Sequence, residues 1–189
     1  FVMNESGFRE KFFLGKEGIT VYLHDFNFKS FNISATVMNS FSATTFNVKI
    51  NKFNVQAEDK ALAATLIHEI MHCVLLNIYR RAQKQDEQAF NSIIGFGSNK
   101  INVYNFFDVM NEGESGSHEL MYCFFYPQMV LILERFAKIH KQTLNTGEAE
   151  FLMWSGLQNT GAYQKLSDEK RSDIEFTILK AKGFEIEKN

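Results

Sequence analysis

The chain has 189 residues, 22 of them acidic and 20 basic, and a formal charge of −2 at pH 7. This length predicts one domain with a sizeable core. The charge balance provides no basic surface for nucleic acid, and without an 18-residue apolar stretch we expect no membrane span. The chain starts at Phe1 without a recognisable signal peptide, so we expect a processed or trimmed fragment, or a domain of a longer protein.

The N-terminal part, residues 1–55, is predicted to be rich in sheet. Two segments, residues 19–24 and 26–31, are rich in β-branched and aromatic residues. In residues 33–38 and 45–50, polar and apolar side chains alternate with the period of a strand. The few residues after the last strand would link it to a helix.

A long helix is predicted from about Glu58 to Arg81, because this run contains neither Gly nor Pro. Its apolar side chains form a stripe broad enough for a largely buried helix: Leu62, Leu66, Ile70, Val74, Leu75 and Ile78. Cys73 in this helix and Cys123 in the next long one are the only cysteines, and we expect both to be small buried core residues.

The C-terminal part, residues 56–189, is predicted to be helical. Residues 83–116 are less regular and rich in turn residues. We expect a helix over 117–141, interrupted or kinked near Pro127, and shorter helices over 148–158 and 167–182. A sheet followed by helices predicts a single α+β domain over residues 1–189.

The most informative motif lies inside the first long helix and reads His68-Glu69-Ile70-Met71-His72. Residues four apart lie on the same face of a helix, so His68 and His72 can direct two imidazole nitrogens at one point. This geometry suits two of the four ligands of a tetrahedral zinc ion. Glu69 lies beside that face and can act as a general base without being a ligand. The alternative is a pair of core histidines bonded to the backbone.

A catalytic zinc normally takes three protein ligands, so a third must come from elsewhere. We favour His118, because it opens the next long helix, where it can face the motif. Glu119 and Glu112 remain alternatives. The other histidines, His24 and His140, are expected to be surface or strand residues.

These segments together resemble the zincin metallopeptidases and, more narrowly, bacterial SprT-like proteins. The resemblance lies in four patterns, which are F-x-V-x-I-N at Phe46–Asn51, A-x-x-L-I-H-E-x-x-H at Ala63–His72, H-E-x-M at His118–Met121 and L-x-W-x-G-L-x-x-T at Leu152–Thr160. It implies a zincin-like fold, in which a mostly antiparallel N-terminal sheet packs on the motif helix and a helical half follows.

The same resemblance implies the chemistry of the site. His68, His72 and His118 would bind Zn²⁺, and Glu69 would be the general base. Zincins often stabilise an oxyanion with a Tyr or His, and the candidates here are Tyr122, Tyr126 and Tyr163. We favour Tyr122, because it follows His118 by one turn on the same helix face. The Trp154 side chain is expected to pack a helix against the core.

We therefore expect a zinc metallopeptidase that acts on a protein or peptide, in the bacterial cytoplasm or secreted. It could also be a toxin-like effector domain of a larger protein, which would have a cognate inhibitor or immunity protein. The alternative is an inactive zincin-fold binding module with a structural metal or none. A third hypothesis is hydrolysis of a non-peptide amide or of cell-wall peptide crosslinks.

Overall fold

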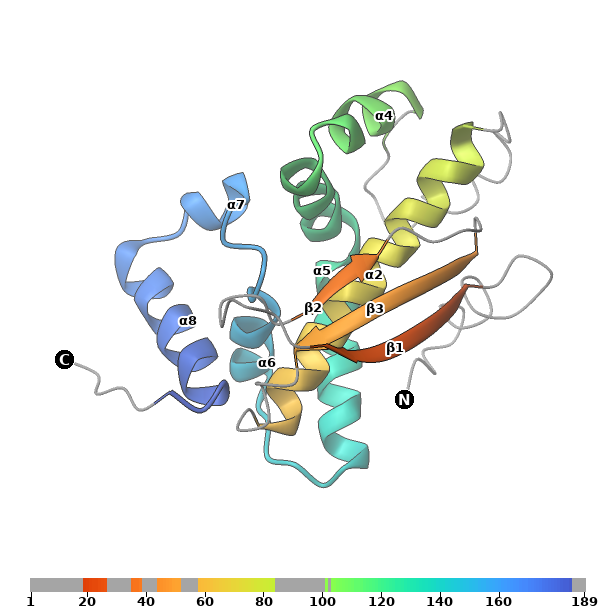
Figure 1. Cartoon of the computed structure of the whole chain (residues 1–189). Coiled ribbons are helices and arrows are strands. Elements are labelled where there is room, and N and C mark those ends of the chain that lie inside the picture. Colours follow the sequence, from red (N-terminus) through yellow and green to blue (C-terminus); the bar gives the residue numbers. More distant parts are fainter. Residues whose placement is uncertain are drawn as a thin grey trace.

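The computed structural model describes residues 19–26, 35–38, 44–51, 58–83, 101 and 103–184. These residues form three strands and six helices (Figure 1): β1 (Thr20–Phe26), β2 (Ala35–Met38), β3 (Thr45–Asn51), α2 (Asp59–Gln83), α4 (Val103–Asn111), α5 (Glu114–Ile139), α6 (Thr146–Met153), α7 (Gly161–Gln164) and α8 (Asp168–Ala181). The chain is thus mostly helical with a small sheet, which confirms the α+β prediction in its broad sense. The strand expected at 26–31 lies, beyond Phe26, outside the described residues.

The sheet has the strand order β1-β3-β2. β2 pairs with β3 in antiparallel fashion, but the longer pairing, between β1 and β3, is parallel, with Thr20 opposite Thr45 and Phe26 opposite Asn51. The expectation of a mostly antiparallel sheet is therefore wrong for the longer of the two pairings. Alternation of polar and apolar residues shows which face of a strand is buried, but it carries no information about the direction of the neighbouring strand.

One face of the sheet packs on α2. Phe46 and Val48 on β3 are fully buried and belong to the same core as Ile67 and Met71 of α2. The guanidinium of Arg80, near the end of α2, lies 5.2 Å from the ring centroid of Phe46. Figure 1 shows the three strands lying across α2, with α5 on the other side of that helix. The predicted packing of sheet on motif helix is thus present.

Helix α2 is the central element of the core. Buried side chains occur on all of its faces, which is typical of a helix enclosed by other elements. Contrary to the sequence expectation, α2 is long and apolar enough to cross a membrane by length and composition alone. However, 78% of the most apolar 18-residue stretch of α2 is buried inside the protein, as in the core helix of a protein that does not cross a membrane. The length and composition of α2 are therefore weak evidence for a membrane-spanning helix.

Helices α4 and α5 correct two predictions. Residues 103–111 form a helix in a stretch that was expected to be less regular, and α5 begins at Glu114, earlier than predicted, without an interruption at Pro127. The glycine-rich string between them suggested a loop, but the turn is short and is made by Gly113, which has a φ of 75°. Gly116 instead allows close packing, because a Cβ there would lie 1.7 Å from the carbonyl oxygen of Val109.

Helices α6 and α8 in the C-terminal part begin directly after residues whose side chains cap them. The side chain of Asn145 accepts a hydrogen bond from the Glu148 N–H at the start of α6, and Ser167 does the same for Lys170 in α8. Gly183, with a φ of 84°, ends α8 as predicted. α6 ends earlier than expected, and a separate short helix, α7, follows it.

The two cysteines differ in their surroundings. Cys73 is buried, and burial raises the pKa of its thiol to about 12. Cys123 is exposed, so the prediction that both are core residues is wrong for Cys123. Cys123 lies on α5 at a position that faces away from the core, which the mostly apolar sequence of that helix did not reveal. Cys73 and Cys123 do not form a disulfide.

Candidate metal centre

Two packed helices bring three histidines together. α2 supplies His68 and His72 from successive turns of one face, and α5, which packs against α2, supplies His118. The Nε2 atom of His72 lies 3.0 Å from Nε2 of His68 and 3.1 Å from Nε2 of His118. One donor atom from each ring lies within 4.8 Å of the others, so this group could hold a metal ion. The sequence predicted all three of these residues.

The hydrogen bonds on the far side of the rings test whether the group suits a metal. Nδ1 of His118 lies 2.9 Å from Oδ1 of Asn159, an oxygen that can only accept. Nδ1 of His72 lies 3.4 Å from Oγ of Ser117, and that hydroxyl donates its own hydrogen to the Glu114 carbonyl at 2.9 Å. Both Nδ1 atoms therefore carry a hydrogen, so that in neutral imidazole, the form that ligates metals, each Nε2 has a lone pair.

Two lone pairs that face each other at 3.1 Å repel, unless a cation lies between them. In a tetrahedral zinc site with bonds of about 2.0–2.1 Å, neighbouring donor atoms lie about 3.3–3.4 Å apart. The observed spacing of the Nε2 atoms is close to that value, and neutral imidazole is the form that ligates metals. The donor set fits a small divalent cation.

Burial keeps the imidazoles of His68 and His72 neutral. His68 is only 6% exposed. Its burial, together with the charges of His72, His118 and Lys182, holds its pKa well below the ordinary value. Burial and the charge of His118 lower the pKa of His72 to about 3.

The loop between α6 and α7 contacts the imidazole rings of His68 and His118. Gly156, which has a φ of +88°, lies directly against His68, and a Cβ there would be 2.6 Å from the Cε1 atom of that ring. Asn159 from the same loop holds His118. Among the described residues, Nδ1 of His68 is buried without a hydrogen-bond partner. The loop therefore fixes the position of His68 by contact and that of His118 by a hydrogen bond.

Glu69 lies between the motif helix and the sheet. It is 8% exposed, and its carboxylate accepts a hydrogen bond from the backbone N–H of Val37 on β2. Burial, and then the negative charge of Glu114, raise the pKa of Glu69 to about 7, although the bond from Val37 acts in the opposite direction. Among the described residues, the group of potential ligands contains the three histidines and not Glu69.

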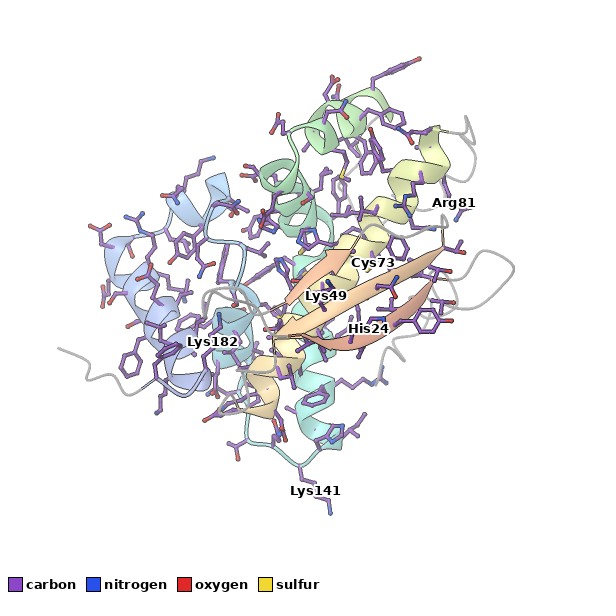
Figure 2. All side chains as sticks on the ribbon, in the orientation of Figure 1. His24, Lys49, Cys73, Arg81, Lys141 and Lys182 are labelled. Carbon is purple, nitrogen blue, oxygen red and sulfur yellow. The ribbon has the colours of Figure 1, made fainter. Side chains whose placement is uncertain are left out.

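The remaining candidates lie elsewhere. The Glu119 carboxylate accepts a hydrogen bond from the backbone N–H of Gly161, and Glu112 is exposed after α4. His24 is exposed on β1, at the edge of the sheet (Figure 2), and His140 is exposed at the end of α5, as expected. Tyr122 stacks on Trp154 with ring centroids 5.0 Å apart, and its catalytic role stays a prediction.

Trp154 packs into the core as predicted, at 5% exposure. Four residues of the site were not predicted from the sequence: Glu114, Ser117, Gly156 and Asn159. Gly156 and Asn159 lie in the L-x-W-x-G-L-x-x-T segment, which was noted only for its resemblance. The sequence could have indicated Glu114 as a neighbour of the site, because it precedes His118 by one helical turn and so lies on the same helix face.

Comparisons with protein-family models, with curated proteins and with solved structures find no match to this chain. A functional assignment therefore depends on the chemistry of the site itself.

The contact between Gly156 and His68 gives a first prediction. A Gly156→Ala substitution would place a methyl group against the imidazole, so we expect the affinity for zinc to fall by about 10- to 100-fold, the range found when the residues that orient metal ligands are lost. The affinity is measured by competition with a chromophoric chelator.

Gly113→Ala is a matched control. Gly113 has a similar φ of +75°, but a Cβ there would meet nothing within 4 Å. Both substitutions should destabilise the fold by about 1–2 kcal/mol through backbone strain. Only Gly156→Ala should weaken metal binding, and an equal loss in the two variants would show that the contact with His68 is unimportant.

The pKa values give a second prediction, for the metal-free protein. Unfolded His72 takes up a proton near 6.5, whereas in the folded protein its pKa is about 3. The unfolded state binds more protons between these values, so the free energy of unfolding should decrease as the pH falls below 6.5, by roughly 1.4 kcal/mol per pH unit for this histidine. His68 acts in the same direction.

Glu69 opposes this trend. The pKa of Glu69 is about 7 in the folded protein and 4.5 in the unfolded protein. Its contribution to the free energy of unfolding is therefore fully present below pH 4.5 and is lost as the pH rises through about 7. Glu69→Gln should therefore make the decline between pH 6.5 and 4.5 steeper. Urea denaturation in the presence of a chelator measures both effects, and a stability that increased on acidification would contradict the assignment.

Proposed function

We propose that this protein is a zinc-dependent metallopeptidase with a zincin-like arrangement. The observation that carries the proposal is the convergence of three histidine Nε2 atoms on one point, while the buried carboxylate of Glu69, the neighbour of His68 in the chain, lies outside the ligand group. The sheet packed on α2, the His68-Glu69-x-x-His72 motif and the resemblance to SprT-like proteins support the zincin-like description. Zinc is the metal that best suits three imidazole ligands without a redox role.

Zinc, when bound, would polarise a peptide carbonyl and lower the pKa of a water molecule. Glu69 would accept a proton from the attacking water as the new C–O bond forms, and would return it to the amine nitrogen as the C–N bond breaks. The hydrogen bond from Val37 holds the Glu69 carboxylate in place for this transfer. Asn159 and Ser117 would keep two of the ligand rings in the tautomer that the metal requires.

Tyr122 is the proposed oxyanion-stabilising residue, because it follows His118 by one turn and its ring is held by Trp154. A protein or peptide is the proposed substrate. A toxin-like effector with a cognate inhibitor or immunity protein remains the biological variant of this proposal.

A second candidate is a non-catalytic module with a structural metal. One observation favours it, because Oε1 of Glu114 lies 4.0 Å from Nε2 of His118 and could close the remaining coordination position. Structural zinc sites have four protein ligands, whereas catalytic sites keep one position open.

Activity of the zinc-loaded protein on a mixed peptide library tests the proposal. We expect cleavage that a chelator abolishes, and a Glu69→Gln variant that keeps one zinc per chain but loses about 10²- to 10⁴-fold in rate, the usual contribution of a general base. Glu169→Gln, the same change at an exposed position of α8, should leave the rate unchanged. Absence of cleavage by the zinc-loaded wild type, or an active Glu69→Gln variant, would overturn the peptidase assignment.

A further inference from the structure

The first turn of α5 carries a second metal-binding pattern, opposite the one on α2. Glu114 is the first residue of the helix, and His118 follows it four residues later. Residues at this spacing lie on one face, and helical side chains lean towards the N-terminus, so the imidazole of His118 leans over Glu114. Accordingly, Oε1 of Glu114 lies 4.0 Å from Nε2 of His118, the atom that points at the other histidines.

Together the two helices offer four donors. α2 contributes His68 and His72, and α5 contributes Glu114 and His118, in each case from successive turns of one face. Donor atoms of a tetrahedral zinc site lie about 3.3–3.4 Å apart. The Glu114 oxygen is therefore less than 1 Å beyond ligand spacing from the nearest histidine nitrogen, as the 4.0 Å separation shows.

The two carboxylates near the histidines differ in their freedom to move. Glu69 is buried and accepts a hydrogen bond from the backbone of β2. The side chain of Glu114 is 81% exposed, and α5 has no side-chain cap at its start, so Glu114 does not serve in that role. Rotation about the side-chain bonds of Glu114 can bring its oxygen to the metal without moving the helix.

We propose that Glu114 is a fourth and displaceable metal ligand, which occupies the open coordination position of the resting protein. It would compete with water and small anions there, and a substrate would have to displace it. The inference rests on the metal centre of the proposed function, but not on peptidase activity. The exposure of Glu114 is what makes it displaceable, because water solvates the released carboxylate and compensates for the lost bond.

The test uses the cobalt-substituted protein, in which visible absorption reports the coordination of the ion. Azide serves as a probe anion for the fourth position and is titrated against the wild type, Glu114→Gln and Glu114→Ala. A tethered ligand competes at a high effective concentration, so we expect both variants to bind azide about tenfold or more tightly than the wild type. Their spectra without azide should also differ from that of the wild type.

Glu112→Gln is the matched control, since it removes the same charge two residues earlier, at an exposed position. It should change the affinity for azide by less than about twofold, as expected of a screened surface charge. An equal increase of the azide affinity in Glu112→Gln and Glu114→Gln would indicate a general effect of charge and would overturn the proposal. Unchanged azide affinity and spectra in both Glu114 variants would also overturn it, as would a wild type that binds no cobalt.

The outcomes separate this inference from the peptidase assignment. Stronger azide binding by the Glu114 variants of a protein without peptidase activity would support the ligand and contradict the enzyme. Peptide cleavage by a wild type whose azide affinity does not depend on Glu114 would support the enzyme and contradict the ligand.

Discussion

The packing of α5 against α2 is the constraint on which the site depends. Each helix places polar side chains one turn apart on the face that meets the other, so the contact between two largely apolar helices contains three imidazoles. Burial of these rings is unfavourable unless every nitrogen is paired. Ser117 and Asn159 pair two of the Nδ1 atoms, and a shared cation would pair the Nε2 atoms, so that only Nδ1 of His68 has no partner among the described residues. Metal binding and helix packing are thus expected to stabilise each other.

The outer elements hold this contact in place. The sheet covers one side of α2 and supplies the Val37 N–H to Glu69. On the other side, the loop between α6 and α7 reaches two of the histidines through Gly156 and Asn159. The carboxylate of Glu119, next to His118, binds the backbone at the start of α7 and so ties this loop to α5. Residues 154–161 are therefore expected to matter for the site, although they come from a different part of the chain.

The sequence predicted the elements whose signals are local. The His68–His72 spacing defines a helical face by itself, and uninterrupted apolar periodicity predicted α2. His118 was predicted because ligand chemistry leaves few candidate residues. The parallel pairing of β1 with β3 was missed because strand direction depends on partners distant in the chain. α4 contains no glycine, but it was missed because the segments on either side of it are rich in glycine and favour turns. Gly156 was missed because only the folded structure shows its contact with His68.

Anomalous diffraction from crystals of the zinc-loaded protein, measured on both sides of the zinc absorption edge, tests the central claim most directly. We expect a single peak between the Nε2 atoms of His68, His72 and His118, about 2.0–2.1 Å from each of them. A peak at another position, or the absence of a peak in a protein loaded with zinc at neutral pH, would contradict the assignment of these histidines as a metal centre.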